Sequence, residues 1–514
     1  ERPYFLWHLY FMDVFQKGGF DVMIGNPPYI QLHKMSNDDI ERLSKSQFKT
    51  FSGTSDIYCL FYEKGFELLK HNGTLCYITS NTWMRTNFGA SLRDIFSSIS
   101  NPVKLLNFED TQIFPSATVE VNILLAKNKE FSGEIEAVAV KSDFNLKQSI
   151  HDYFTEKKIR LDSLSNESWI ILDPLDFSIL NMIKESGVVL KNWDVEFYRG
   201  MLTGFNDAFY IDGQKRKELI QQDPKNENII KRLIRGREIR RWHYEFNDNY
   251  AIYPHNGVKE NRQKGTDAIP RINVKRDYPV IYEHLLQYKD KNSPLAVQKS
   301  DGTYQTLIER KDQGDHWTNL RNCAYIMQLE DEKLVWLAIT DRPTFAYDNK
   351  STYVSNPSYF MSGKHLKYLL GFLNSRVIQW YMDKITSSTG QGTNQWNKMY
   401  IELLPIPLPD KQLIESKFET LSEYLTFINS IEVSDIFENI NKQSVTELFE
   451  NVLDMMVYEN YFKDELRSKE LDVLQFITEK NFPDISVMSP DYKIAIIQKV
   501  YYELQQKDNP IRNR

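Results

Sequence analysis

The chain has 514 residues and a net charge of −7, and 41% of its residues are hydrophobic. This hydrophobic content excludes a disordered chain, and the length suffices for about two to four domains, each with its own core. No stretch approaches the roughly 18 uncharged apolar residues that a membrane span needs. Three widely spaced cysteines exclude a disulfide scaffold and a zinc site built on a Cys-x-x-Cys pair. We therefore expect the protein to reside in a reducing cytoplasm.

The first part of the chain alternates segments that are typical of strands and helices. Residues 20–24 form a short apolar run that predicts a buried strand, and residues 56–70 carry apolar side chains at helical spacing. Alternation at this spacing predicts an α/β fold with a largely parallel sheet flanked by helices. The further elements predicted here are strands over 74–79 and 103–108, a helix over 89–98 and a hairpin-like pair over 114–126.

The rest of the chain divides by composition into two further blocks. Residues 191–410 have a net charge of +5 and mix short strands with many turn residues, which predicts an α+β domain. Residues 411–514 have a net charge of −7, contain no glycine and are rich in helix-forming residues, which predicts an α-helical block. We therefore expect a domain over 1–168, a connector over 169–190, and domains over 191–410 and 411–514.

The densest cluster of positive charge lies in the basic block. Six of the eleven residues from Lys231 to Arg241 are cationic, and such a run releases counterions when it binds a phosphate backbone. A solvated helix face is the alternative that the run alone does not exclude. The cations expected to contact nucleic acid are Lys231, Arg232, Arg235, Arg237, Arg240 and Arg241.

The candidate catalytic motif is Asn26-Pro27-Pro28-Tyr29, which directly follows the predicted strand over 20–24. The carboxyl ends of strands are where open α/β sheets bind ligands. Pro28 biases Pro27 toward an extended conformation, so the turn can present the Pro27 carbonyl and the Asn26 side-chain oxygen as two fixed acceptors. Two such acceptors would draw an exocyclic amine toward tetrahedral geometry and free its lone pair for attack on a methyl donor. Tyr29 adds a face for base stacking, worth about 1–3 kcal/mol. The alternative is a turn whose prolines merely end the strand.

The first part of the chain contains, in order, the motifs Asn26–Tyr29, Ser55–Tyr58 with Phe61, Leu75–Trp83, and Ile113-Phe114-Pro115. These four motifs resemble the catalytic half of the N6-adenine DNA methyltransferases. The resemblance implies a partial Rossmann-like methyltransferase sheet in which Asn26, Pro27, Pro28 and Tyr29 are catalytic. It also implies that Phe61 contacts the adenine of S-adenosylmethionine, and that an extruded target base stacks between Tyr29 and Phe114. The four motifs together span residues 26–115 of the chain.

The basic block resembles the TaqI-like target-recognition domain of type II restriction–modification enzymes. This implies site-specific adenine N6-methylation of double-stranded DNA within a restriction–modification system. Arg199, Thr203 and Asn206 would join the arginine-rich run in binding DNA. The segments that carry the resemblance are Arg199–Phe209, Leu233–Ile239, Leu370–Ser375, Leu403–Pro407 and, more loosely, Leu448–Tyr461 in the helical block.

One part of such an enzyme is missing from the sequence. A site for S-adenosylmethionine in this fold needs a glycine-rich first loop and an acidic residue after the next strand. Few residues precede the strand over 20–24, and the last glycine of the chain is Gly392, so neither feature is found. We therefore expect this chain to be the carboxyl-terminal portion of a longer enzyme, and to be inactive in methylation as an isolated fragment.

Two other functions stay open at this point. A DNA sequence-specificity module without catalysis is compatible with the missing donor-binding half. A protein-glutamine methyltransferase uses the same Asn-Pro-Pro-Tyr turn on an amide nitrogen, but those enzymes are short, and the +5 charge of residues 191–410 favours DNA. The spacing of the nine histidines predicts no metal site.

Overall fold

The computed structural model describes residues 5–109, 113–114, 120–141, 143–145, 147–161, 168–259, 268–299, 302–386, 394–432, 437–438 and 440–514. The chain forms two compact units. Unit 1 comprises residues 1–181 and 381–395, and unit 2 comprises residues 182–380 and 396–514. The chain passes from one unit to the other within α7 (Pro174–Ser186) and again within α13 (Arg376–Ile385).

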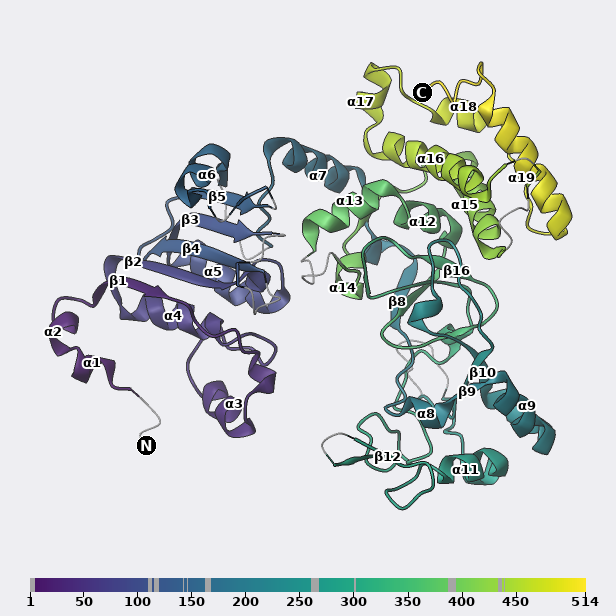
Figure 1. Cartoon of the computed structure of the whole chain (residues 1–514), viewed down its shortest axis with the longest axis horizontal. Coiled ribbons are helices and arrows are strands. Elements are labelled where there is room, and N and C mark those ends of the chain that lie inside the picture. Colours follow the sequence, from purple (N-terminus) through teal and green to yellow (C-terminus); the bar gives the residue numbers. More distant parts are fainter. Residues whose placement is uncertain are drawn as a thin grey trace. The chain divides into compact units, whose positions relative to one another are not determined.

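Unit 1 is built around a six-stranded sheet with the strand order β1-β2-β4-β3-β5-β6 (Figure 1). β1 pairs parallel with β2, β3 pairs parallel with β5, and β4 lies antiparallel between β2 and β3. The carboxyl ends of β1, β2, β3 and β5 therefore meet at one edge of the sheet. The α/β class expected from the sequence is confirmed. The strands are β1 (Phe20–Gly25), β2 (Leu69–Ser80), β3 (Asn101–Phe108), β4 (Val121–Lys127), β5 (Ile135–Val140) and β6 (Ile159–Leu161).

The helices of unit 1 cover the two faces of this sheet unequally. α4 and α5 pack on one face around a core of large aromatic side chains that includes Tyr62, Trp83 and Phe96. α6 contributes Tyr153 and Phe154 to a smaller cluster that also contains side chains of β3, β4 and β5. The helices are α1 (Trp7–Tyr10), α2 (Met12–Phe15), α3 (Asn37–Ser44), α4 (Tyr58–Leu68), α5 (Ala90–Ser98) and α6 (Ile150–Lys157).

Two sequence-based expectations about this sheet need correction. The hairpin-like pair expected over 114–126 is not formed: among the described residues of that segment only β4 is a strand, and its partners are β2 and β3. The strand expected over 74–79 begins earlier, at Leu69, directly after α4. Asn72 adopts a positive φ of 62° and donates its backbone N–H to the Asn128 carbonyl at 2.9 Å, and the pairing of this irregular strand with β1 shifts register between Phe20 and Val22.

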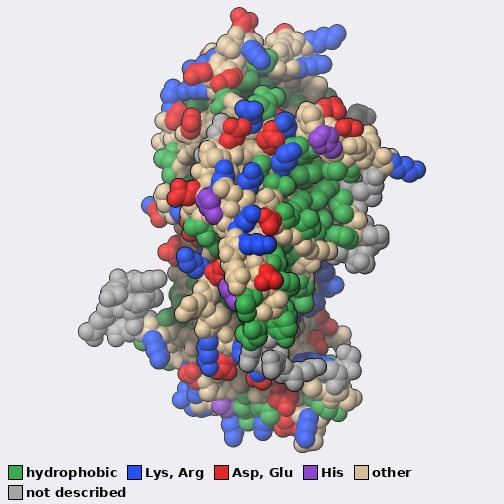
Figure 2. Space-filling view, turned by 90° about the vertical axis from the view of Figure 1, so that its left-hand side faces the viewer, with side chains coloured by type: hydrophobic (Ala, Val, Ile, Leu, Met, Phe, Trp, Pro, Cys, Tyr) green, Lys and Arg blue, Asp and Glu red, His purple; other side chains and the backbone are tan. Residues whose placement is uncertain are grey.

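The outer edge of the sheet, along β1, is exposed and apolar. β1 has no second strand partner among the described residues, and Ile24 on this strand is 80% exposed. Hydrophobic side chains gather into a broad area on the side of the molecule drawn in Figure 2. The exposed large hydrophobic residues in the first 25 positions are Phe5, Leu6, Leu9, Tyr10, Phe11, Met12, Val22 and Ile24.

Unit 2 combines two four-stranded sheets with peripheral helices. One sheet has the order β17-β10-β11-β9, and the other has the order β16-β14-β18-β8. The strands are β7 (Val188–Val189), β8 (Val195–Arg199), β9 (Tyr210–Asp212), β10 (Ile230–Ile234), β11 (Asn249–Ile252), β12 (Val297–Gln298), β13 (Tyr304–Gln305), β14 (Lys333–Trp336), β15 (Ile339–Thr340), β16 (Ala346–Asp348), β17 (Tyr353–Val354), β18 (Tyr359–Gly363) and β20 (Pro405–Ile406); β19 (Asn394–Gln395) falls at the end of unit 1.

The last hundred residues of unit 2 are helical, as the glycine-free composition predicted. α12 packs on α15, and α15 packs on α16, so the helical block shares a core with the preceding domain. In the part of the chain that the structure describes, no helix is long and apolar enough to span a membrane. The helices are α8 (Asn206–Phe209), α9 (Gly213–Gln222), α10 (Val274–Asp277), α11 (Pro279–Leu286), α12 (Leu366–Leu373), α14 (Lys398–Ile401), α15 (Gln412–Ser430), α16 (Lys442–Tyr461), α17 (Lys463–Ser468), α18 (Leu474–Glu479) and α19 (Pro490–Gln505).

A buried carboxyl group on α16 makes the stability of this block depend on pH. Asp454 is buried and accepts a hydrogen bond from the backbone N–H of Arg376 at 2.9 Å. Burial raises its pKa to about 6, although the guanidinium groups of Arg376 and Arg241 act in the opposite direction. The folded protein therefore keeps this proton to a higher pH than the unfolded chain does. The contribution of Asp454 to the free energy of unfolding falls as the pH rises from about 4 to about 6.

We expect the Asp454→Asn variant to lack this loss. We compare the change in the free energy of unfolding between pH 4.5 and pH 7. The wild type should lose about 1–3 kcal/mol more over this range than the Asp454→Asn variant does. Denaturant titrations at both pH values measure the difference. The Asp491→Asn variant, at an exposed position on α19, serves as the control and should follow the wild type. An Asp454→Asn profile parallel to that of the wild type would contradict the assignment.

Candidate functional site

The Asn26–Tyr29 turn leaves the sheet at the carboxyl end of β1, as predicted. The Asn26 side chain is exposed and has no hydrogen-bond partner among the described residues, whereas Pro27 is buried. Tyr29 is half-buried, and its hydroxyl donates to the Ile78 carbonyl of β2 at 3.4 Å. Burial raises the pKa of Tyr29, so the phenol stays neutral. The turn thus offers a free carboxamide beside an aromatic ring that is anchored to the neighbouring strand.

The structure brings the second predicted motif against this turn. The backbone N–H of Leu32 donates to the Ser55 carbonyl at 2.9 Å, and the N–H of Ile57 donates to the Ile30 carbonyl at 2.9 Å. The Tyr29 and Tyr58 rings are nearly perpendicular, with centroids 6.4 Å apart. Two motifs that are about 30 residues apart in sequence therefore form one local structure at the carboxyl end of β1.

The aromatic residues expected to line a base pocket lie near each other. Phe114 and Tyr29 both pack against the cluster that contains Phe108 and Val121. Phe61, expected to contact a donor, lies on α4 and is 42% exposed. Pro115, which completes the fourth motif, lies outside the described residues. Two aromatic side chains from separate loops therefore share one hydrophobic cluster beside the Asn26 turn.

A polar network at the same sheet edge was not predicted. Asn81, which follows β2, donates to the Asn107 side chain of β3 at 2.9 Å. Asn107 in turn donates to Glu109 at 2.8 Å, and Arg85 forms an ion pair with Glu109 at 2.8 Å. These contacts join the loops after β2 and β3. The available signal was position alone, because Asn81, Asn107 and Glu109 lie at or just past the end of a predicted strand.

The arginine-rich run does not form a helix face. It occupies β10 and the following 3₁₀ turn Gly236–Glu238, and four of its six cations are engaged by residues of unit 2 that lie more than ten positions away in the sequence. These engagements are an ion pair from Lys231 to Glu330 at 2.6 Å, Arg232 over Phe246 at 4.0 Å from the ring centroid, Arg235 over Tyr210 at 5.6 Å, and an ion pair from Arg241 to Glu450 at 3.2 Å.

The remaining two cations of the run, Arg237 and Arg240, are exposed, and the Arg240 guanidinium also forms an ion pair with Glu245 at 3.1 Å. Arg199, at the end of β8, is also exposed, and its guanidinium lies 5.7 Å from the Tyr359 ring centroid. Thr203 is buried: its hydroxyl donates to the Asn206 side chain at 2.6 Å and accepts from the Phe205 backbone N–H at 3.2 Å. Thr203 therefore closes a turn inside the domain, whereas Asn206 is exposed on the surface.

Comparisons with known protein families match both parts of the chain. Residues 2–114 match the Eco57I restriction-modification methylase family, and residues 231–406 match the TaqI-like C-terminal specificity domain. The first segment contains the Asn26–Tyr29 turn, and the second contains the arginine-rich run. The two family matches therefore coincide with the two regions that the motifs had singled out.

Individual relatives agree with these matches. The type II restriction enzyme and methyltransferase RM.Eco57I of Escherichia coli is 25% identical over 449 residues, which cover 80% of this chain and 43% of that protein. The type II methyltransferase M.BanIII of Aneurinibacillus aneurinilyticus is 20% identical over 82% of this chain and 76% of its own length. The chain thus spans less than half the length of RM.Eco57I.

A solved structure supports the fold. The type IIL restriction-modification enzyme MmeI, determined in complex with DNA, superposes with a TM-score of 0.51 at 12% identity and covers 94% of this chain and 57% of that one. At this identity the likeness concerns the fold alone. The family comparisons thus find residues 2–114 similar to the Eco57I restriction-modification methylase family and residues 231–406 similar to the TaqI-like C-terminal specificity domain.

Proposed function

We propose that this chain supplies the target-base pocket and the DNA-recognition domain of a type II DNA methyltransferase. The enzyme would methylate N6 of adenine at a specific site in double-stranded DNA, with S-adenosylmethionine as the donor, within a restriction–modification system. The curated relatives carry the names of type II methyltransferases, in one case of a combined restriction enzyme and methyltransferase. Adenine as the target base, and base extrusion from the duplex, rest on the geometry of the turn after β1.

The observation that carries this proposal is the carboxamide of Asn26 at the carboxyl end of β1, which is exposed and has no hydrogen-bond partner among the described residues. Polar groups at this edge of an α/β sheet face bound ligands, and an unused amide oxygen there is available to a substrate. Tyr29 and Phe114, which pack against one cluster, offer aromatic faces for an extruded base. A pocket with amide acceptors and aromatic walls suits a planar base that carries an amino group.

The chemistry proposed for these residues is substrate positioning. The Asn26 side-chain oxygen and the Pro27 carbonyl accept the two N6 hydrogens, which localises the nitrogen lone pair. Tyr29, anchored through its hydroxyl to Ile78, fixes the plane of the base. When bound, S-adenosylmethionine would supply the methyl group and leave as the neutral thioether, and the methylated N6 would release one proton to solvent.

The described residues form only part of a donor site. Phe61 presents an exposed ring, but no glycine-rich loop follows a described strand to receive the rest of the donor, so we assign no donor contact beyond Phe61. We propose that a donor-binding half adjoins the open apolar edge along β1, where Ile24 is exposed. A strand added at such an edge satisfies the free backbone groups and covers the apolar side chains.

Two measurements test the proposed function. Calorimetric titration of this chain alone with S-adenosylmethionine should show no micromolar binding. When the chain is joined to a donor-binding half, mass spectrometry of nucleosides from modified duplex DNA should show N6-methyladenine and no methylcytosine. Methylcytosine would reject the target base, and DNA binding without any methylation would favour the specificity module.

The exposed arginines of the recognition domain give a further prediction. We expect the Arg237→Ala/Arg240→Ala double variant to bind duplex DNA about tenfold more weakly at 0.1 M salt. The slope of log K against log salt should also become shallower by about two, because two phosphate contacts are lost. A fluorescence anisotropy titration over a range of salt concentrations measures both values.

The control removes the same charge from the acidic helical block. The Arg467→Ala/Lys469→Ala variant changes two exposed cations at the end of α17, and both its affinity and its slope should match the wild type. Equal losses in the two double variants would mean that net charge, and not the surface around Arg237, governs binding.

A further inference from the structure

The turn that follows the arginine-rich run has a strained backbone. Trp242 adopts a φ of +76°, in the left-handed region that bulky residues rarely occupy, and its side chain is 1% exposed. Its backbone N–H donates to the Phe345 carbonyl at 2.9 Å. Such a conformation persists only where the surrounding structure fixes it, and it is found most often at functional sites. The contacts that fix Trp242 therefore show what this turn depends on.

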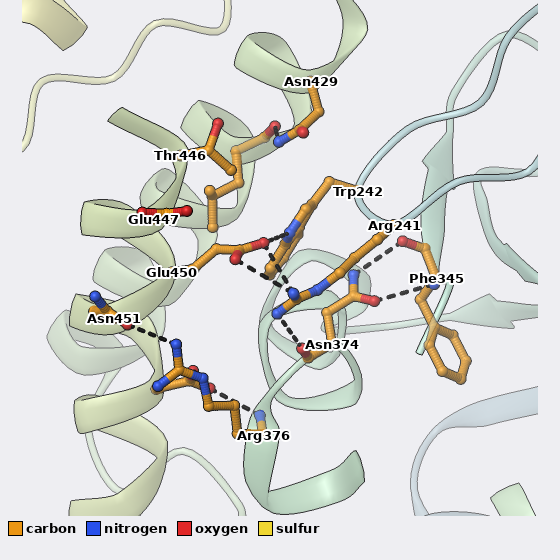
Figure 3. A network of polar contacts seen from close by, with 12 residues as sticks. Arg241, Trp242, Phe345, Asn374, Arg376, Asn429, Thr446, Glu447, Glu450 and Asn451 are labelled. Atoms are coloured by element: carbon orange, nitrogen blue, oxygen red, sulfur yellow. Dashed lines mark hydrogen bonds and ion pairs between the residues drawn. The ribbon is translucent and has the colours of Figure 1, made fainter. Parts of the chain in front are cut away.

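A single carboxylate on the helical block holds both residues of the turn. Glu450 on α16 accepts the Trp242 indole N–H at 2.6 Å and pairs with the Arg241 guanidinium at 3.2 Å (Figure 3). Arg241 also donates to the Asn374 carbonyl at 2.8 Å. Asn374 completes the network by exchanging two hydrogen bonds with the Phe345 backbone, at 2.9 and 3.1 Å. Glu450 is thus the acceptor shared by two neighbouring side chains of one strained turn.

The same turn limits where the exposed arginines can lie. The backbone N–H of Arg240 donates to the His243 carbonyl at 2.9 Å, so Arg241 and Trp242 form the tip of a tight reversal. Arg240 is exposed immediately before this tip, and Arg237 is exposed three residues earlier. Fixing the tip on Glu450 therefore fixes the backbone that carries both exposed cations.

We propose that Glu450 is a positioning residue for DNA binding, and that α16 therefore contributes to DNA recognition together with the basic block. This inference rests on the proposed function, because it assumes that Arg237 and Arg240 contact DNA. Glu450 touches no DNA in this proposal. It acts through the Arg241–Trp242 tip, which keeps the exposed arginines in a fixed position and spares them the loss of conformational freedom on binding.

The sign of the effect separates positioning from simple electrostatics. Removing a negative charge near a DNA-binding surface should tighten binding, because the repulsion between that charge and phosphate disappears. Removing Glu450 should weaken binding instead. We expect Glu450→Gln, which keeps an acceptor for the Trp242 indole, to weaken duplex binding about threefold, and Glu450→Ala to weaken it about tenfold.

The experiment uses the full chain and a mixed-sequence DNA duplex in fluorescence anisotropy titrations, with circular dichroism to verify folding. Glu447→Gln is the matched control: it removes the same charge from the same helix, at an exposed residue whose one hydrogen-bond donor in the described part of the chain is Gln443, at 2.9 Å. Its affinity should equal or slightly exceed that of the wild type. If Glu450→Ala fails to fold, the Glu450→Gln variant still carries the test.

A second comparison identifies the route of the effect. In the Arg237→Ala/Arg240→Ala background, the Glu450→Gln change should cost no further affinity, because the residues through which it acts are gone. Tighter binding by Glu450→Gln, or the same threefold loss in both backgrounds, overturns the proposal. A wild-type chain without salt-dependent duplex binding would instead reject the proposed function itself.

Discussion

The Asn26→Ala variant is expected to lose methyl transfer while keeping its affinity for DNA. Asn26 would supply one of two acceptors that act on the reacting nitrogen, and removal of one preorganised polar contact at a reacting centre costs about 100-fold to 1000-fold in rate. The side chain is neutral, exposed and without a partner in the described part of the chain, so its loss should leave the fold and the phosphate contacts intact. Single-turnover methylation and equilibrium DNA binding, measured on the enzyme with its donor-binding half, separate the two effects.

Asn87→Ala provides the matched control for this variant. Asn87 is an exposed asparagine of the same unit, in the short 3₁₀ turn Asn87–Gly89. Its rate and its affinity should both equal those of the wild type. An Asn26→Ala rate within tenfold of the wild type would reject the role assigned to the carboxamide, and a parallel loss of DNA binding would indicate a structural role.

Local patterns predicted the elements around the site well. β1 was expected over 20–24 and spans Phe20–Gly25. A short apolar run that ends at Gly-Asn-Pro-Pro is typical of a buried strand followed by a turn. α5 was expected over 89–98 and spans Ala90–Ser98. The place of β4 between β2 and β3 could not be predicted, since the pairing partners of a strand depend on contacts between segments that are distant in sequence.

The recognition domain shows a similar limit for charge. The run from Lys231 to Arg241 is a candidate basic surface, but composition could not tell which of its cations are paired within the fold. The partner of Arg241 is Glu450, 209 residues later in the chain, and the partner of Lys231 is Glu330. The six cations look equivalent in the sequence. In the folded chain Arg237 and Arg240 are exposed, whereas Arg241 is held in place by its contact with Glu450.

A second large effect is expected at the buried ion pair between Lys333 and Asp348. Both side chains are fully buried, and their charged groups lie 3.1 Å apart. The Lys333 ammonium also donates to the carbonyls of Leu329 at 2.8 Å and Asp331 at 2.9 Å, so it is fully satisfied. We expect Lys333→Met to lower the free energy of unfolding by about 3–5 kcal/mol, because the Asp348 carboxylate is left buried without its counter-charge. Denaturant titration of the full chain measures the change.

The control for Lys333→Met is Lys364→Met, which breaks the ion pair with Asp194 on the surface of the same unit. Exposed pairs contribute about 0–1 kcal/mol, so this variant should be nearly as stable as the wild type. A comparable loss in both variants would contradict the buried pair as the cause. Asp348 also accepts from the Tyr244 hydroxyl at 2.7 Å. Tyr244 lies two residues after Trp242, so a carboxylate left without Lys333 is expected to disturb the arginine-bearing turn and to weaken DNA binding along with stability.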